Sequence, residues 1–175
     1  QHFVTIADAT GLPVVLYNNP GRTGVNLSAG LVARLAQHPN IVGIKDSSGD
    51  LSLTWEMIRQ STGDFRVLMG RDSLIYAGLH HGAAGAIAAT ANVVPALVVE
   101  IYEAFQAGDQ ERSLKAQERL ATLRQAFGLG SFPVVIKDAM NMVGLPAGPP
   151  RRPIRSLEGA AREALRCVLM EVGTL

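Results

Sequence analysis

Two side chains suited to covalent chemistry, Tyr17 and Lys45, each stand at the end of an apolar stretch. Residues 41–44 (IVGI) predict a strand buried on both faces, and that strand ends on Lys45. Loss of solvation disfavours the ammonium form of a lysine, and a neutral amine can form a Schiff base with a carbonyl substrate. The residue pattern alone leaves an alternative open, in which Lys45 merely caps the strand and pairs with Asp46 or another acid.

The elements that must hold these two residues are strands alternating with helices. Strands are predicted over 12–17, 41–45, 65–69 and 85–89, with helices over 2–9, 28–37, 50–58, 73–81 and 95–106. Such alternation predicts a parallel sheet. Tyr17 and Lys45 are 28 residues apart, which is close to one βαβ unit. We therefore expect both at the carboxyl ends of neighbouring strands, where parallel-sheet enzymes build active sites.

The segment between the first two strands, residues 18–24 (NNPGRTG), is dense in turn-forming residues and is predicted to be a loop. Its glycines and Arg22 could cradle a phosphate, but their spacing is not that of a P-loop. A phosphate site over Gly82 to Ala91 is a further alternative. Small residues there are explained more simply by close packing of a helix on a strand.

Beyond residue 108 the alternation stops, and three helices follow, over 109–126, 133–143 and 156–172. This pattern predicts two domains, an α/β part at 1–107 and a helical part at 108–175. The first helix has no capping residue before it, so we expect the chain to be the C-terminal part of a longer protein.

Composition narrows the classes of function. The chain has 175 residues, 47% of them hydrophobic and 18% charged, with a net charge of +1, which argues against nucleic acid or an anionic membrane as the main partner. No apolar run approaches the roughly 20 residues of a membrane span, and no signal-peptide pattern is visible. The single Cys167 excludes an internal disulfide and fits a reducing, cytoplasmic compartment. Scattered histidines make a structural zinc site improbable. Cys167, Trp55, Met57 and Met69 are predicted core residues.

Four motifs carry a resemblance to a known family. They are Tyr17–Gly24 (YNNPGRTG), Gly43–Asp46 (GIKD), Gly82–Asn92 (GAAGAIAATAN) and Phe132–Leu145 (FPVVIKDAMNMVGL). Together they resemble the dihydrodipicolinate synthase/N-acetylneuraminate lyase family across essentially the whole chain. The resemblance implies a (β/α)8 TIM barrel with a C-terminal three-helix domain, of which this chain supplies the last four βα units and the complete helical domain. It also implies a homotetramer, no cofactor and no metal.

The same resemblance suggests roles for individual residues. Lys45 matches the Schiff-base lysine, and Tyr17 matches the tyrosine that relays protons at the imine. Arg22 matches the arginine that binds the carboxylate of the aldehyde substrate, while Gly70 and Ile87 match positions whose backbone lines the pocket. The family's threonine pair and its tyrosine from a neighbouring subunit belong to earlier strands.

The implied function is that of a class I lyase that condenses pyruvate with an aldehyde, first of all aspartate semialdehyde for lysine biosynthesis. The alternatives are a 2-keto-3-deoxy-sugar-acid aldolase or dehydratase, which the Asp46-Ser47-Ser48 sequence resembles, and a non-catalytic relative or inactive fragment. We expect these 175 residues alone to be inactive, because a barrel of this kind needs about 250 residues to close. The side chains of Val15, Ile44 and Leu68 are expected to face the barrel interior.

Overall fold

A computed structural model describes residues 1–61 and 63–175. Its chain separates into two compact units, Gln1–Ala88 and Ala89–Leu175, which are described one at a time. The predicted domain boundary at residue 107 refers to a complete barrel and stays a prediction.

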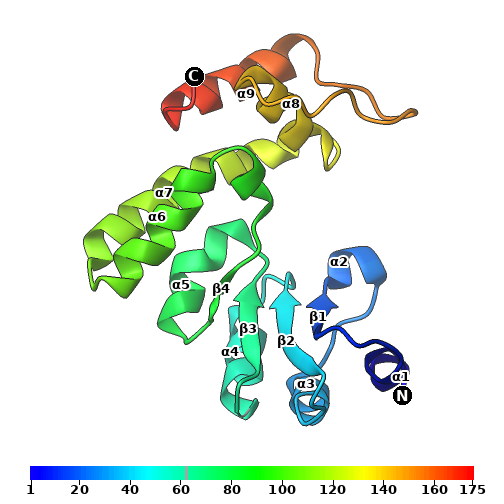
Figure 1. Cartoon of the computed structure of the whole chain (residues 1–175). Helices are drawn as coiled ribbons and strands as arrows, with labels where there is room; N and C mark the ends of the chain where they lie inside the picture. Colours follow the sequence, from blue (N-terminus) through cyan, green and yellow to red (C-terminus); the bar gives the residue numbers. More distant parts are fainter. Residues whose placement is uncertain (62) are drawn as a thin grey trace. The chain divides into compact units, whose positions relative to one another are not determined.

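The first unit is built around a four-stranded parallel sheet with the strand order β1-β2-β3-β4 (Figure 1). The α/β class predicted from the alternation of strands and helices is therefore confirmed. Its elements are α1 (His2–Ala9), β1 (Val14–Asn18), α2 (Pro20–Thr23), α3 (Ala29–Leu35), β2 (Ile41–Asp46), α4 (Leu51–Gln60), β3 (Arg66–Met69), the 3-10 helix η1 (Asp72–Leu74), α5 (Ile75–His80) and β4 (Gly85–Ala86).

One face of this sheet is covered by helices. Leu16, Ile44 and Val67 point to that face, where they share a buried cluster with Val32 of α3 and Met57 of α4. Ile44 is fully buried there, so the expectation that it faces the barrel interior is wrong.

The physical reason is the alternation of side chains along a strand: Lys45 points to the face of Tyr17, so its neighbour Ile44 points to the helix-covered face. A register shift between β1 and β2 lies just before this point. Val14 pairs with Ile41, but the next residue, Val15, pairs with Gly43. β2 therefore advances by two residues where β1 advances by one. Such a bulge reverses the alternation of side chains. Beyond it, Tyr17 and Lys45 pair and share the opposite face with Val15, which is 47% exposed.

Two helices of this unit begin at residues whose side chains cap them. The Ser28 side chain accepts a hydrogen bond from Leu31 N–H, and the Asp50 side chain accepts one from Leu53 N–H. Each satisfies a backbone donor that the first turn of a helix leaves unpaired. Asp50 thereby fixes α4 directly after β2, next to the end of the strand that carries Lys45.

Two predicted segments differ from the structure. The expected loop at residues 18–24 contains a full helical turn, α2, because Pro20 starts it and Gly24 closes it in the left-handed conformation (φ 71°). The expected strand at 85–89 is shorter, since β4 ends at Ala86 and only Ile87 N–H extends the pairing, to Met69 O. Trp55 is 42% exposed rather than a core residue, and its indole lies edge-on to the His81 ring.

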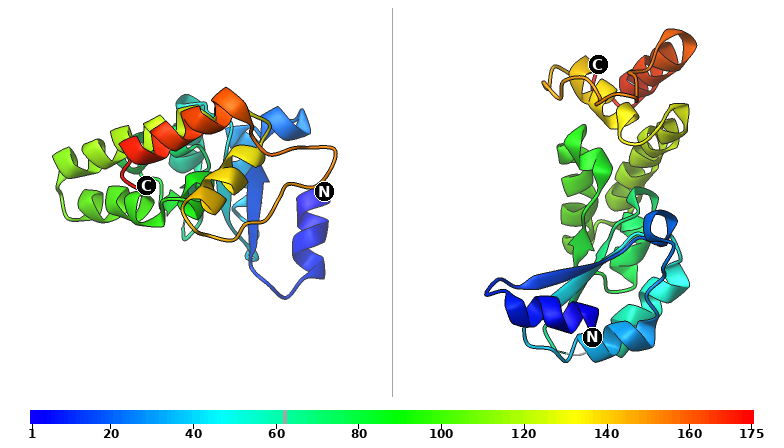
Figure 2. Two further views of the ribbon diagram at one scale, coloured as in Figure 1. Left: turned by 90° about the horizontal axis from the view of Figure 1, so that it is seen from above. Right: turned by 90° about the vertical axis from the view of Figure 1, so that its right-hand side faces the viewer.

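The second unit is helical. Its elements are the 3-10 helix η2 (Ala89–Asn92), α6 (Pro95–Gln106), α7 (Gln110–Gln125), the 3-10 helix η3 (Ala126–Leu129), α8 (Val134–Met142) and α9 (Gly159–Glu171). Helices α6 and α7 lie side by side (Figure 2), and the buried Ser113 hydroxyl donates to Ile101 O across them. No helix within the described residues has the length and apolar character that a membrane span requires.

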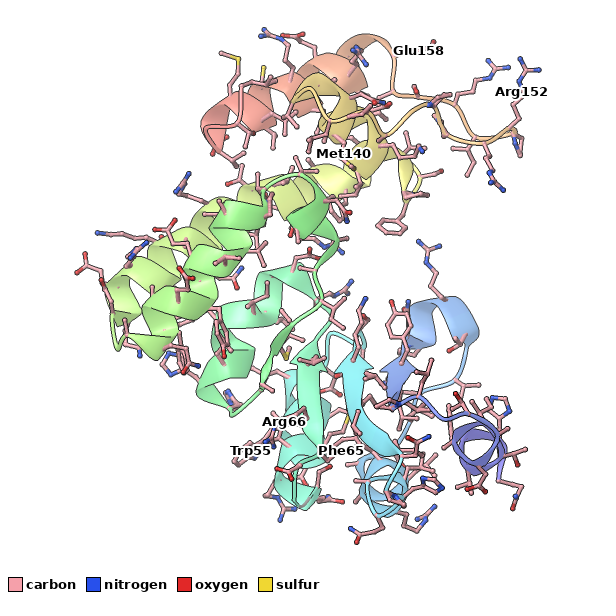
Figure 3. All side chains as sticks on the ribbon, viewed as in Figure 1. Trp55, Phe65, Arg66, Met140, Arg152 and Glu158 are labelled. Atoms are coloured by element: carbon pink, nitrogen blue, oxygen red, sulfur yellow. The ribbon has the colours of Figure 1, made fainter. Side chains whose placement is uncertain are left out.

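Helix α9 begins three residues later than predicted. The buried carboxylate of Asp138 accepts Leu157 N–H at 2.6 Å, which holds this backbone outside the helix. The extended segment before it carries Arg152 and ends at Glu158 (Figure 3). Cys167 of α9 is exposed, so its expected place in the core is wrong.

The close approach of β2 and β3 gives a test of this packing. A Cβ on Gly43 would lie 2.5 Å from the backbone oxygen of Arg66, whereas Gly30 in α3 has open space around it. We expect Gly43→Ala to destabilise the full-length protein by roughly 1–3 kcal/mol through overpacking. The control Gly30→Ala should stabilise it by about 0.5–1 kcal/mol, because alanine favours a helix. Thermal unfolding measures both, and equal midpoints for the two variants would contradict the predicted packing.

Candidate active site at the carboxyl ends of β1 and β2

Tyr17 and Lys45 are register partners on adjacent parallel strands. Paired residues of a parallel sheet point to the same side, and here the Lys45 Nζ atom lies 4.5 Å from the centroid of the Tyr17 ring. Lys45 and Asp46 are consecutive and point to opposite faces. Within the described residues no ion pair joins them, so the alternative of a simple Lys45–Asp46 pair is not what the structure shows.

The hydroxyl of Tyr17 has a polar setting. Asn19 Nδ2 donates to Tyr17 Oη at 2.9 Å, and Lys45 lies beside it. Partial burial would raise the Tyr17 pKa, but hydrogen bonding by Ser47, the charge and hydrogen bonding of Lys45, and the Asn19 bond together outweigh burial and lower that pKa. A phenol whose pKa is lowered exchanges its proton more readily near neutral pH.

Gly70, immediately after β3, leaves the space that these side chains occupy. A Cβ at this position would lie 2.1 Å from Ser47 Oγ and 3.0 Å from Lys45 Cε. Any larger residue would therefore push the serine hydroxyl and the lysine side chain out of place. Gly70 was predicted to line the pocket, and its lack of a side chain is the property that matters in this structure.

On the helix-covered face, a buried carboxylate holds the strand ends together. Asp46 is 1% exposed. Its Oδ1 accepts from Asn18 Nδ2 at 2.9 Å and from Ser48 N–H at 3.0 Å, while its Oδ2 accepts from Ser48 Oγ at 2.9 Å and Thr54 Oγ1 at 2.6 Å. These bonds link β1, β2, the turn after β2 and α4. They fix the backbone on either side of Lys45.

The same network anchors the loop after β1. The buried side chain of Asn18 accepts Leu27 N–H at 3.0 Å and donates to Asn26 Oδ1 at 2.8 Å, which ties the far end of the loop to the strand. Between these anchors lies α2, on which Arg22 is exposed. The structure thus places Arg22 on a short helix fixed at both ends beside the strand that carries Tyr17.

Of the predicted site residues, the structure brings Tyr17, Lys45 and Gly70 together. Ile87 follows β4 at the same edge of the sheet, with its side chain 45% exposed and its N–H bonded to Met69 O. Sequence reasoning did not single out Asn18, Asn26 and Thr54, and it did not predict that Asp46 is the buried centre of their hydrogen-bond network. The only available signal was that Asn18 and Asp46 each follow a strand-end residue by one position.

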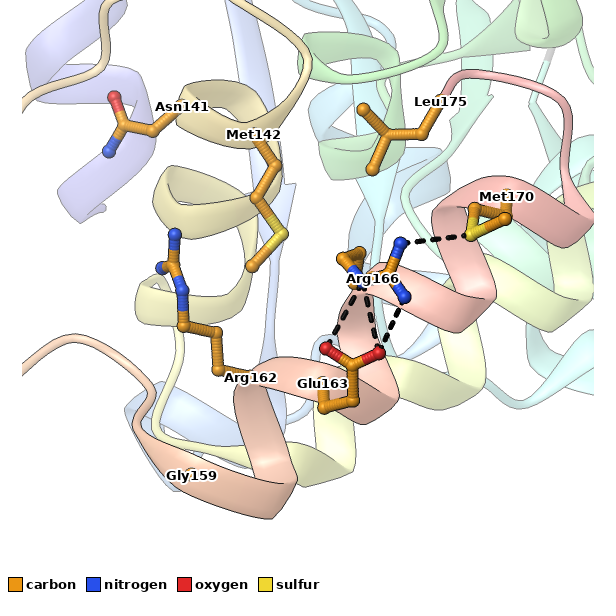
Figure 4. Close-up of a pocket in the computed structure, with 8 residues that line it drawn as sticks. All are labelled: Asn141, Met142, Gly159, Arg162, Glu163, Arg166, Met170 and Leu175. Carbon is orange, nitrogen blue, oxygen red and sulfur yellow. Dashed lines mark hydrogen bonds and ion pairs between the residues drawn. The ribbon is translucent and has the colours of Figure 1, made fainter.

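A cavity of about 580 Å³ lies in the second unit (Figure 4). Its charged lining is already paired in part, because Arg166 donates to both carboxylate oxygens of Glu163 at 2.7–3.1 Å. No lysine or tyrosine is among the residues that line this cavity. We therefore place the candidate active site at the strand ends. Among the described residues no group of three His, Cys, Asp or Glu side chains is arranged to hold a metal ion.

A parallel sheet flanked by helices, followed by a helical unit, is the C-terminal part of a (β/α)8 barrel protein with an appended helical domain. The chain belongs to the dihydrodipicolinate synthetase family, whose model matches residues 1–172. It is 44% identical over 174 residues to a 4-hydroxy-tetrahydrodipicolinate synthase from Methanoculleus marisnigri, covering 99% of this chain and 60% of that relative.

Solved structures of members of this family also match the chain. One, described as the first monomeric dihydrodipicolinate synthase variant, matches with a TM-score of 0.95 at 32% identity over 100% of this chain and 60% of its own length. Another is YagE from Escherichia coli K12, a prophage protein of the same family in complex with pyruvate. It matches with a TM-score of 0.93 at 31% identity over 99% of this chain and 60% of its own. The chain thus spans about 60% of the length of these relatives.

The Asp46 network makes a testable contribution to stability. Thr54→Val keeps the shape of the side chain but removes the 2.6 Å hydrogen bond to Asp46 Oδ2. We expect this variant to lose about 1.5–3 kcal/mol of the free energy of unfolding, the usual size for a hydrogen bond to a charged group. Thr5→Val is the matched control, because its hydroxyl bonds to Gln1 O at an exposed site, and it should stay within about 0.5 kcal/mol of wild type. Comparable urea-unfolding midpoints for both variants would show that the network contributes little.

Proposed function

We propose that the full-length protein is a 4-hydroxy-tetrahydrodipicolinate synthase, which condenses pyruvate with aspartate semialdehyde through an imine on Lys45. The observation that carries the proposal is the position of Lys45 Nζ, 4.5 Å from the Tyr17 ring centroid at the carboxyl edge of the sheet. The names of the most similar curated relatives support the same activity.

In this proposal the neutral amine of Lys45 attacks the keto carbon of pyruvate. Loss of water gives a protonated imine, which draws electrons from the adjacent methyl group, so that a proton leaves and an enamine forms. The enamine carbon then adds to the aldehyde carbon. Water attacks the resulting imine and breaks its C=N bond, which releases the product and restores the amine. Each stage moves a proton at the imine nitrogen, at the carbon next to the imine or at a substrate oxygen. Tyr17, with a lowered pKa, is the group placed to carry it.

Arg22 is the proposed recognition group for the carboxylate of the aldehyde. A guanidinium can grip a carboxylate through two parallel hydrogen bonds, a geometry that a lysine does not reproduce. Its place on α2, anchored through Asn18, Asn26 and Leu27, supports this role. Gly70 and Ile87 complete the proposed pocket, Gly70 by leaving room for Ser47 and Lys45, and Ile87 by its position after β4.

A second candidate is an aldolase or dehydratase acting on 2-keto-3-deoxy-sugar acids. The Asp46-Ser47-Ser48 sequence favours it, since it resembles the corresponding sequence of several keto-deoxy-sugar-acid aldolases of the family. The synthase and the aldolase share the pyruvate imine and differ in the aldehyde, whereas a dehydratase would form the imine with the sugar acid itself and eliminate water. We further propose that the protein acts in the cytoplasm as a homo-oligomer, with no nucleic-acid or membrane partner.

Trapping the imine tests the shared step. Incubation of the full-length protein with pyruvate and borohydride should reduce the imine to a stable secondary amine on Lys45, which peptide mass spectrometry locates. Lys115, paired with Glu111, and Lys137, bonded to Ala147 O, are internal controls that should remain unmodified. An adduct on either control lysine with Lys45 unmodified would exclude the proposed chemistry.

Arg22→Ala tests the choice of aldehyde. We expect it to raise the free energy of the transition state with aspartate semialdehyde by roughly 2–4 kcal/mol, while the reaction with glyceraldehyde changes little. Arg34→Ala on α3, another exposed arginine of the same unit, is the control and should leave kcat/KM unchanged for both aldehydes. Equal losses with both aldehydes would make Arg22 a structural residue and weaken the synthase assignment.

A further inference from the structure

The hydroxyl of Ser47 is a polar group at the site that the proposed reaction does not yet use. Ser47 follows β2 directly, and its N–H extends the pairing of the strands by donating to Asn18 O at 2.8 Å. Its Oγ is buried and, within the described chain, completes no hydrogen bond. Burying a hydroxyl without a partner opposes folding, so such a group calls for an explanation.

Gly70 leaves the room in which this hydroxyl lies. The position that a Cβ of Gly70 would take is 2.1 Å from Ser47 Oγ and 3.0 Å from Lys45 Cε. The hydroxyl and the lysine chain therefore border the same small volume. Ser47 and Lys45 are separated by one residue, and alternation along the strand puts both on the face of Tyr17.

Ser47 also acts on the phenol of Tyr17. Of the influences that lower the Tyr17 pKa, hydrogen bonding by Ser47 is the largest, ahead of the charge of Lys45. Asn18 and Asp46 are register partners, so Ser47 lies opposite Asn19, the residue whose side chain donates to Tyr17 Oη. Among the residues that the structure describes, the Ser47 hydroxyl itself forms no hydrogen bond. A serine hydroxyl can rotate to suit a partner, and a phenolate is a much stronger acceptor than a phenol.

We propose that Ser47 is a positioning residue for Tyr17. The Ser47 hydroxyl donates a hydrogen bond to the phenolate oxygen each time Tyr17 gives up its proton. The proposal rests on the proposed function and deepens it. Lys45 cannot stabilise the Tyr17 phenolate at every stage, because the charge of its nitrogen changes as the amine attacks and the imine forms. Ser47 and Asn19 are neutral donors that stay in place at every stage, so they form a fixed polar setting for the transferred charge.

Direct titration of the Tyr17 phenol tests the interaction with Ser47 without relying on enzyme activity. The absorbance of phenolate is recorded against pH for the full-length protein, and the curve of the Tyr17→Phe variant is subtracted to isolate Tyr17. In Ser47→Ala the titration midpoint of Tyr17 should move to higher pH, because a donor to the charged form is lost. With pyruvate and aldehyde, kcat should fall about tenfold while KM for pyruvate changes less than twofold, as for the loss of one hydrogen bond to a charged group.

Ser61→Ala is the matched control. Ser61 Oγ is the other buried hydroxyl that completes no hydrogen bond among the described residues, but it caps the C-terminal end of α4. Both alanine variants should melt no lower than wild type, since each removes an unpaired hydroxyl. Only Ser47→Ala should shift the phenol. Ser47→Cys, which has a similar shape and is a weaker donor, should shift it in the same direction and serves if the alanine variant fails to fold.

An unchanged Tyr17 midpoint in both Ser47 variants would overturn the proposal, as would an equal shift in Ser61→Ala. If the midpoint shifts but the protein shows no aldol activity with any aldehyde, the proposed function fails while the Ser47–Tyr17 interaction stands. The two failures are thus distinguishable.

Discussion

A single buried carboxylate, that of Asp46, holds the candidate active site in place. Removing a carboxylate from water costs several kcal/mol unless donors replace the lost solvent. Here the donors come from Asn18, Ser48 and Thr54, which belong to three different segments of the chain. The need to satisfy this charge therefore fixes β1, β2 and α4 relative to one another. Lys45 sits one residue before it on the opposite face, so its position follows from that constraint.

The fold was largely predictable from sequence because its signals are local. Alternating apolar segments and turn residues predicted the four parallel strands, and the helices predicted over 28–37 and 50–58 begin at the residues that cap them, Ser28 and Asp50. The orientation of Ile44 was predictable from its neighbour, since Lys45 on the face of the site puts Ile44 on the other face. The burial of Ile41 in the same cluster as Ile44 was not, because a bulge depends on how two strands pair and leaves no mark on one of them. The late start of α9 was missed for a similar reason, since it depends on a bond between Leu157 and Asp138, nineteen residues apart.

The reactive residues of the site were predictable from the sequence, but the residues that hold them in place were not. Tyr17 and Lys45 end two strands one βαβ unit apart, and the structure pairs them. The roles of Asn18 and Ser47 depend on which face of the sheet they occupy and on the space left by Gly70. Sequence gives neither of these, because both arise from packing between strands. Polar residues next to a strand-end lysine look in sequence like ordinary turn residues.

The anchoring of the loop after β1 has a consequence for how such a protein changes over evolutionary time. Its two ends are tied down by the buried Asn18, through Asn26 and Leu27, while the stretch from Gly21 to Val25 is exposed. Replacements within that stretch disturb neither the sheet nor the pair of Tyr17 and Lys45. Gly24 is the exception, because its left-handed conformation disfavours a side chain, and Thr23 bonds the backbone of the loop. At Gly21, Arg22 and Val25, new side chains can be tried beside a preserved pair of Tyr17 and Lys45 at small cost in stability.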